Sequence, residues 1–142
     1  MHLSNTIAKI IESCLDDRKT LLDECRNLDP SQQALLTRLA AEREEFVRQL
    51  EQLSPAPAKT SWRESLRLLG THAFERAAGP NTGDSIAACK RSQARTTAEY
   101  EKALELDLPS DVRTVLTSQY ERIRVEREEL TRLEFGRAVN EA

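Results

Sequence analysis

The chain of 142 residues is poor in the residues that build sheets, loops and covalent scaffolds. Aromatic residues make up 4% of it, and it contains four glycines, five prolines, three cysteines and two histidines. This composition excludes a collagen-like chain, a low-complexity chain and a disulfide scaffold. Because β-branched and aromatic residues are scarce and helix formers dominate, a sheet is disfavoured. The length suits one domain and not comfortably two.

The sequence also lacks the segments that would carry it to or across a membrane. Residues 1–6 show no basic region followed by an apolar run, so no secretory signal peptide is expected. No stretch approaches the roughly 18 uninterrupted apolar residues of a membrane span. Cys14 and Cys25 lie about 16 Å apart along one predicted helix, beyond disulfide reach, so reduced thiols are expected. These features favour a cytoplasmic protein that binds no membrane.

Charges of both signs are abundant and nearly balanced, with 21 Lys+Arg against 24 Asp+Glu and a net charge of −3. The arginines of residues 113–137 alternate with glutamates, which is typical of a solvated helix face and not of a nucleic-acid-binding stripe. Glu44 with Arg48, and Glu128 with Arg132, stand four residues apart and predict salt bridges on the helix surface. We therefore expect no nucleic-acid partner.

Apolar residues recur every three or four positions, the period of an amphipathic helix, in five segments of the chain. Asp29 is a good N-cap, and Pro30 suits the first position of the helix that follows it. Pro55 and Pro57 end that helix, because proline removes a helical donor and clashes with the preceding turn. The predicted helices span residues 5–27, 30–53, 61–78, 84–106 and 109–135, and residues 136–142 are expected to form a frayed tail.

Four of the predicted helices are long and form two pairs. Each pair is joined by a very short turn that contains a proline, and so short a connection makes its helices antiparallel neighbours. The pairs are separated by a connection from Ser54 to Gly83 that holds the short helix. Two hairpins joined by one long crossover is the ferritin-like plan. The sequence therefore predicts a single all-α domain, a ferritin-like four-helix bundle whose crossover contains a short fifth helix.

Short motifs of the chain resemble a bacterial family of uncharacterised ferritin-like four-helix-bundle proteins over about residues 5–135. The motifs are Leu-Ala-Ala-Glu-Arg at 39–43 with Phe46, Tyr-Glu-Lys-Ala-Leu at 100–104, Asp-Leu-Pro at 107–109 and Gln119-Tyr120. The resemblance implies the fold and a soluble bacterial origin, and it implies no established reaction.

The chain departs from the pattern of that family at three places. It has Asp16-Asp17-Arg18 where the family tends to read Asp-Gly-Glu, and Ser92-Gln93 where the family tends to read Gly-Glu. Arg127 stands where a histidine is common. If the family holds metal at these positions, this chain lacks the ligands.

A dinuclear metal site is the sharpest chemical hypothesis for such a bundle. It needs a glutamate from each of two helices and a Glu-x-x-His from each of the other two. No Glu-x-x-His occurs, and the two histidines are His2 and His72. An all-carboxylate site stays open as an alternative, but cationic side chains at the central inward positions would oppose a divalent ion. We expect no metal and no cofactor; the carboxylates open to the alternative are Glu24, Glu42, Glu45, Glu99, Glu126 and Glu129.

The central inward positions follow from the heptad phase of each long helix. They predict one polar layer, in which three arginines and a glutamine face one another: Arg18, Arg43, Gln93 and Arg127. Because unpaired buried charge is costly, neighbouring carboxylates such as Asp17, Glu42 or Glu126 should pair with the arginines. The layer is interpreted as an ion-pair layer that fixes the helix register, or as arginines that reach out to solvent. The functional alternative is a pocket for a small anion.

Trp62, Leu66 and Leu69 form an apolar stripe on the predicted crossover helix. They either cover the bundle or present a surface for a homodimer or a protein partner. No phosphate-binding glycine loop, no Cys-x-x-Cys and no nucleophile–histidine arrangement is present, so no enzyme is expected. The leading prediction is a non-enzymatic cytoplasmic structural or protein-interaction bundle. The alternative is a metal-binding or stress-response carboxylate protein with an unconventional site.

Overall fold

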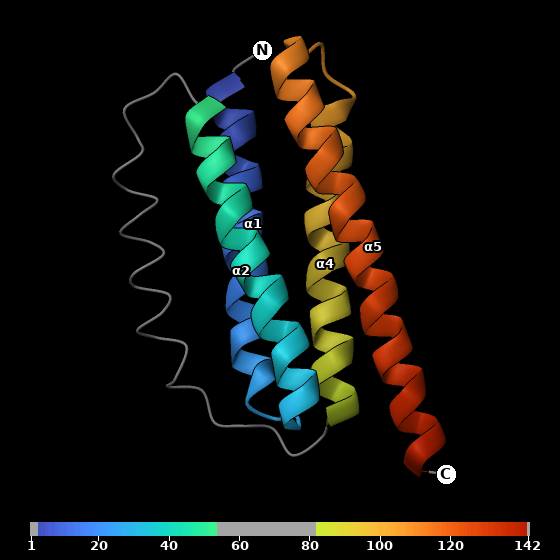
Figure 1. Cartoon of the computed structure of the whole chain (residues 1–142). Helices are drawn as coiled ribbons and strands as arrows, with labels where there is room; N and C mark the ends of the chain where they lie inside the picture. The colour runs from blue at the N-terminus through green and yellow to red at the C-terminus, as the bar shows by residue number, and fades with distance from the viewer. Residues whose placement is uncertain (1–2, 54–81, 142) are drawn as a thin grey trace.

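The chain folds into four helices where its structure is described. The computed structural model describes residues 3–53 and 82–141, and these ranges contain no strand (Figure 1). The prediction of an all-α protein is confirmed. The predicted short helix at residues 61–78, with Trp62, Leu66 and Leu69, lies outside the described residues, as do His2 and His72. The four helices are α1 (Leu3–Cys25), α2 (Pro30–Leu53), α4 (Thr82–Leu104) and α5 (Ser110–Glu141).

The turn between α1 and α2 is capped as its sequence predicts. Asp29 Oδ1 accepts a hydrogen bond from the backbone N–H of Gln32 at 3.0 Å, and Gln32 Oε1 accepts one from the backbone N–H of Asp29 at 3.2 Å. Pro30 is the first helical residue, where its missing N–H would have had no helical acceptor. This reciprocal pair works as a capping box and starts α2 at one defined residue.

The turn between α4 and α5 is closed by Arg113. Its guanidinium donates hydrogen bonds to the backbone carbonyls of Leu104 at 3.0 Å and Leu106 at 2.6 Å, at the end of α4. The helix end thereby gains donors for carbonyls that have no partner within the helix.

The helix α5 continues to Glu141, so the predicted end at residue 135 and the frayed tail from residue 136 are wrong. A glycine within a helix, such as Gly136, costs only about 1 kcal/mol, and no proline follows it to stop the helix. The other predicted helix ends differ from the observed ones by two residues at most.

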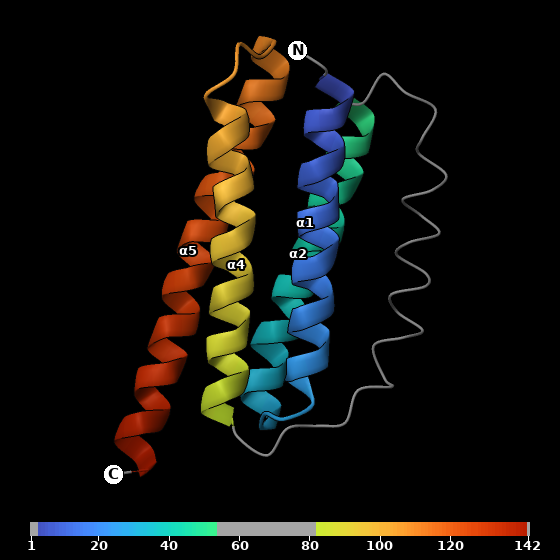
Figure 2. The same cartoon turned by 180° about the vertical axis from the view of Figure 1, so that it is seen from behind.

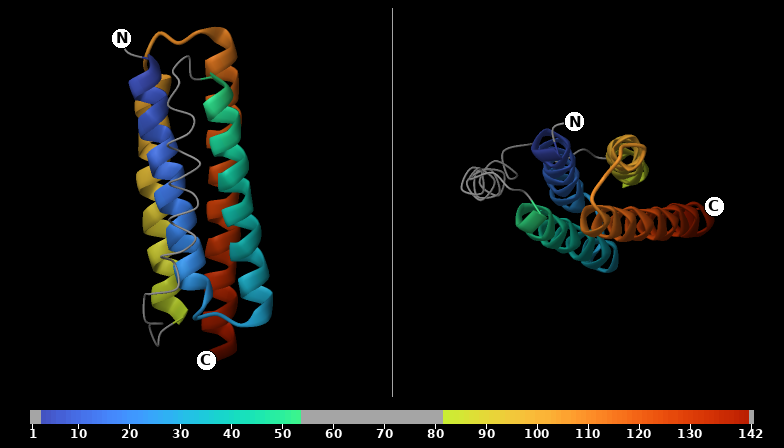
Figure 3. Two further views of the ribbon diagram at one scale, coloured as in Figure 1. Left: turned by 90° about the vertical axis from the view of Figure 1, so that its left-hand side faces the viewer. Right: turned by 90° about the horizontal axis from the view of Figure 1, so that it is seen from above.

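The four helices run lengthwise beside one another (Figures 1 and 2). The neighbouring pairs are α1 with α2, α1 with α4, α4 with α5, and α2 with α5, so the bundle is square when seen along its length (Figure 3). At one end α1 and α5 begin, and at the other end α2 and α4 begin, so each helix is antiparallel to both of its neighbours. The end of α2 and the start of α4 therefore lie at opposite ends of the bundle.

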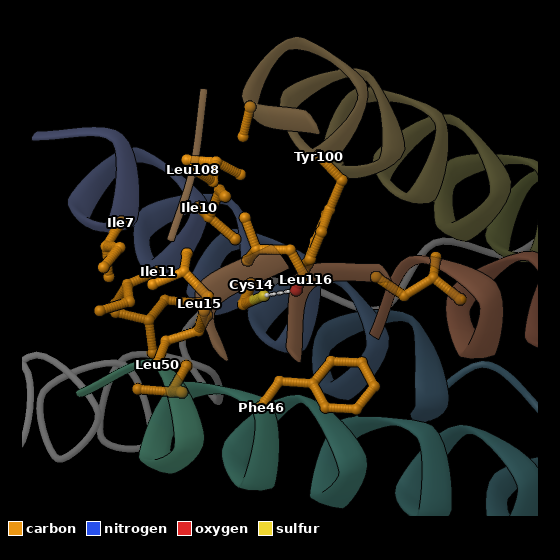
Figure 4. Close-up of a cluster of buried hydrophobic side chains, with 14 residues drawn as sticks. Ile7, Ile10, Ile11, Cys14, Leu15, Phe46, Leu50, Tyr100, Leu108 and Leu116 are labelled. Atoms are coloured by element: carbon orange, nitrogen blue, oxygen red, sulfur yellow. Dashed lines mark hydrogen bonds between the residues drawn. The ribbon is translucent and has the colours of Figure 1, made fainter. Parts of the chain in front are cut away.

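The apolar core is divided into two clusters along the bundle. The first cluster lies toward the end where α1 and α5 begin and takes buried side chains from all four helices (Figure 4). The second cluster lies toward the opposite end and contains Leu21, Leu36, Leu39, Ile86, Cys89 and Leu130 among its buried members. No helix in the described ranges combines the length and apolar character that crossing a membrane requires. The space between the two clusters is occupied by polar side chains.

Candidate functional site: a buried ionic layer

Four polar side chains, one from each helix, are fully buried near the middle of the bundle. They are Asp17 of α1, Arg43 of α2, Gln93 of α4 and Glu126 of α5, each with 0% exposure. A hydrogen bond between Tyr100 and Gln119 fixes the register of α4 against α5. Gln93 and Glu126 lie seven residues, or two helical turns, beyond this contact in the same direction, so they lie at one level. These four residues are called the ionic layer below.

Arg43 is the centre of the ionic layer. Its Nε donates a hydrogen bond to Asp17 Oδ2 at 2.6 Å, and its Nη2 lies 2.5 Å from Glu126 Oε1. The Phe46 ring lies below the guanidinium, whose central carbon is 5.4 Å from the ring centroid. Two buried carboxylates share one buried guanidinium, and ions taken out of water are destabilising unless paired and hydrogen-bonded. The layer therefore adds little net stability, whereas a shift of one helix along the others would leave its charges unpaired.

Several atoms of the layer have no aligned hydrogen-bond partner among the described residues. They include Asp17 Oδ1, both amide atoms of Gln93 and both carboxylate oxygens of Glu126. The contact of Glu126 with Arg43 is thus an ion pair held by charge, without the alignment of a hydrogen bond. Each buried polar group left in this state costs about 1–3 kcal/mol. A core of this kind is less stable than an apolar one and is correspondingly sensitive to the loss of any single charge.

The predicted layer of Arg18, Arg43, Gln93 and Arg127 is wrong at two of its four positions. Arg43 and Gln93 are buried where the heptad phase places them. Arg18 lies at the edge of the bundle and donates to Glu44 at 2.6 Å, and Arg127 is exposed on α5. The inward positions belong to the residues immediately before them, Asp17 and Glu126. In α1 and α5 the inward stripe advances by three residues at this turn, from Cys14 to Asp17 and from Ile123 to Glu126, where the predicted phase advances by four.

An ionic network connects the layer to the surface between α2 and α5. Arg122 Nε lies 3.8 Å from Glu126 Oε2, and Arg122 Nη2 donates to Glu42 Oε1 at 2.9 Å. Hydrogen bonding to Glu42 raises the pKa of Arg122 above its ordinary value. Arg38 in turn pairs with both Glu42 and Glu129. The seam between α2 and α5 is therefore joined at this level by charge.

A second polar chain crosses the first cluster from α1 to α2. Tyr100 donates its hydroxyl proton to Gln119 Oε1 at 2.6 Å, so the Cys14 thiol, 3.4 Å from the Tyr100 oxygen, acts as donor to it. Gln119 Nε2 donates to the Phe46 carbonyl at 3.3 Å and to Gln49 Oε1 at 2.9 Å. Figure 4 shows Cys14 and Tyr100 meeting inside the bundle. The chain takes one or more members from each of the four helices.

The buried thiols are poor nucleophiles at neutral pH. Burial raises the pKa of the Cys14 thiol to about 11, and burial also raises the pKa of Cys89 strongly. The reactive species of a cysteine is the thiolate, so both side chains stay protonated and inert under ordinary conditions. Burial likewise raises the pKa of the Tyr100 hydroxyl well above its ordinary value.

The carboxylates proposed for a metal site are dispersed. Glu42 binds Arg122, Glu45 binds Arg48, Glu99 binds Lys102 and Glu129 binds Arg38. Glu126 is the member of the set that enters the ionic layer, where Arg43 faces it. In residues 3–53 and 82–141, no three side chains of histidine, cysteine, aspartate or glutamate form a group that could hold a metal ion.

The sequence indicates Asp17 and Glu126 as members of the layer, but it does so ambiguously. It predicts both residues as partners of the arginines, and the structure brings both to Arg43. Each is followed by an arginine in the sequence, so a polar inward position could be read as either residue. The shape of the apolar pattern does not decide between them.

Comparison of the chain with family models, with curated proteins and with solved structures found no match.

Proposed function

We propose that this protein is a non-enzymatic bundle of the ferritin-like plan, in which the ionic layer takes the place of a dinuclear metal site. It then serves as a structural or protein-interaction module. The observation that carries the proposal is the position of Arg43, fully buried between the carboxylates of Asp17 and Glu126. Carboxylates that converge at the middle of a four-helix bundle need a positive charge. Here the guanidinium supplies the charge that a metal ion supplies in the metal-holding bundles.

The direction of the helices supports the ferritin-like part of the proposal. The two hairpins, α1 with α2 and α4 with α5, are connected between opposite ends of the bundle, and α2 runs parallel to α4 (Figure 3). A four-helix bundle with one long crossover of this kind is the plan of ferritin-like proteins. Simple up-and-down bundles instead alternate direction at every helix along the chain.

The competing function is a carboxylate metal protein with an unconventional site. The observation in its favour is that Asp17, Gln93 and Glu126 keep buried oxygens without an aligned donor in the described part of the chain. Such oxygens are ligands that hard cations prefer. However, Arg43 lies within 2.6 Å of both carboxylates, so a divalent ion would have to displace a buried guanidinium. The ion-pair function is therefore favoured.

A cytoplasmic location is part of the proposal. Its support is that Cys14, Cys25 and Cys89 are all free thiols, and two of them are buried in the core. Oxidising compartments favour disulfides, whereas reducing ones keep such thiols free.

Elemental analysis tests the proposal most directly. The protein is purified without chelator or affinity tag from cells grown with added iron and manganese, and is then titrated with Fe(II) and Mn(II). We expect no stoichiometric metal in either experiment. One or two equivalents of bound metal per chain would overturn the proposal in favour of the metal protein.

A variant tests whether the layer has the place of a metal site. Arg43→Glu puts a third carboxylate in the layer. We expect the melting temperature of this variant to rise when Mn(II) is added. Arg48→Glu, whose side chain is 58% exposed, is the matched control and should show no such gain. If neither variant responds to Mn(II), the substitution of charge for metal is refuted, while the non-metal function of the natural chain stands.

A further inference from the structure

A groove of about 660 Å³ lies on the outer face of the α4–α5 hairpin. It is separate from the ionic layer, and its size is within the range of small-molecule sites. The α5 residues of the groove are spaced three and four apart, so they form one stripe of the helix. The lining residues are Thr97 and Glu101 of α4 and Tyr120, Arg124, Arg127, Glu128, Thr131 and Arg132 of α5.

At one end of the groove, the side chains interact with one another. The Tyr120 hydroxyl donates to Glu101 Oε2 at 2.7 Å, and the Arg124 guanidinium lies 5.7 Å from the centroid of the Tyr120 ring. The hydrogen bond to Glu101 raises the pKa of Tyr120, so the hydroxyl remains a neutral donor at pH 7. These three side chains hold one another in place and form a preorganised wall.

The other end contains two arginines without carboxylate partners. Within the described residues, neither Arg127 nor Arg132 has a carboxylate within ion-pair distance. The predicted salt bridge between Glu128 and Arg132 is absent from this part of the chain, and so is the one between Glu44 and Arg48. Glu44 forms a salt bridge with Arg18, and Arg48 forms one with Glu45. In a chain whose net charge is −3, two unpaired arginines in one concavity are an anion-binding arrangement.

We propose that this groove binds a small phosphomonoester of a hydroxylated compound, of the sugar-phosphate class. A phosphomonoester carries about −1.5 to −2 charges at pH 7, which matches the two unpaired guanidinium groups. The guanidinium fork donates paired hydrogen bonds to phosphate oxygens. The free carboxylate of Glu128 lies in the same groove and can accept hydrogen bonds from the hydroxyl groups of the ligand.

The observations favour a small ligand over a nucleic acid. The groove has a volume of about 660 Å³, and glutamates interrupt its positive charge at Glu101 and Glu128. A long polyanion would meet the net negative charge of the molecule beyond the groove. The site goes beyond the proposed function, because the groove and the ionic layer share no residue.

The test is isothermal titration of the full chain at fixed ionic strength with glucose 6-phosphate, inorganic phosphate and glucose. We expect saturable 1:1 binding of glucose 6-phosphate, weaker binding of inorganic phosphate and none of glucose. Arg127→Gln with Arg132→Gln should weaken glucose 6-phosphate binding at least about tenfold, since both phosphate contacts are lost. Two-dimensional NMR of the complex should show shifts confined to residues 97–101 and 120–132.

The matched control is Arg91→Gln with Arg95→Gln, which removes two exposed arginines of α4 that do not line the groove. It changes the net charge equally and should leave the affinity within about twofold. Equal loss in both double variants would overturn the proposal, because the attraction would then be general. It would also be overturned if no saturable binding occurs, or if a single-stranded oligonucleotide binds more tightly and displaces the sugar phosphate.

Discussion

The two apolar clusters of the bundle differ in what α5 contributes to each. In the first cluster, α5 and the turn before it bury Leu108, Val112, Leu116 and Ile123. In the second cluster, the buried member from α5 is Leu130. Past Ile123 the helix is joined to its neighbours mainly by ion pairs, and it diverges from them toward its C-terminus (Figures 1 and 3). The helix α5 is therefore held mainly by apolar burial up to Ile123 and largely by charge beyond it, where Leu130 is its buried apolar side chain.

This difference separates stability from register. Apolar burial is large but non-directional, so the first cluster stabilises the bundle without distinguishing neighbouring alignments. Ion pairs between exposed groups contribute little, yet a buried pair is strongly destabilising when broken. We therefore expect the ionic layer, placed between the clusters, to select one alignment of the four helices.

The largest effect is expected at Arg43. Arg43→Leu leaves Asp17 and Glu126 as two facing buried carboxylates, and removing one partner of such a group costs about 3–5 kcal/mol. Chemical denaturation at pH 7 measures the loss of unfolding free energy. The matched control replaces Asp17, Arg43 and Glu126 together by leucine, which should restore stability to the natural value or above. An unchanged or raised melting temperature of Arg43→Leu would show that the layer does not set the register.

A similar or smaller effect is expected when one leucine of α5 is shortened in each cluster. Leu116→Ala should lower the free energy of unfolding by about 3–5 kcal/mol, because the shortened side chain leaves a cavity where all four helices pack. Leu130→Ala should cost about 2–3 kcal/mol, because α5 contributes a single buried side chain to the second cluster and can move toward the space that the shortened side chain leaves. Amide hydrogen exchange should show that Leu130→Ala speeds exchange only in α5 beyond Ile123. If both variants speed amide exchange in all four helices, the two ends of α5 open together.

An effect about as small as that of Leu130→Ala is expected from pH. Burial raises the pKa of Cys14 from 9.0 to about 11, so the folded state holds a proton that the unfolded state loses first. Stability from this group is full below pH 9 and is lost as the pH rises to about 11, a fall of about 2–3 kcal/mol. Cys14→Ala should flatten this alkaline slope, whereas Cys25→Ala, which removes a half-buried thiol, should not. An identical slope in all three proteins would place the titration in other groups.

The sequence predicts the helices well because their signals are local. The 3.6-residue apolar period marks each long helix, and Asp29 with Pro30 marks the start of α2 through a capping interaction within four residues. The end of α5 is missed, since Gly136 alone weakens a helix without stopping it.

The site is predicted only in part, because two polar residues that are adjacent in the sequence fit the inward position of the helix equally well. Asp17 precedes Arg18, and Glu126 precedes Arg127, so the apolar pattern permits either member to face inward. The choice depends on which side chain meets Arg43 across the bundle, and that contact joins residues 26 and 83 positions apart. The groove of α5 escapes prediction because the spacing of Glu128 and Arg132 predicts a salt bridge between them, and the described residues show none there.

The hydrogen-bond chain from Cys14 through Tyr100 and Gln119 to the Phe46 carbonyl has one direction. Each member donates to the next, so none can be reversed without leaving a buried donor unmet. A bundle with the two hairpins packed the other way round could bury similar apolar surface, but it would not bring these donors to these acceptors. This hydrogen-bond chain therefore favours one handedness of the bundle. A bundle of the opposite handedness would be destabilised by buried donors without acceptors, even if it buried a similar apolar surface.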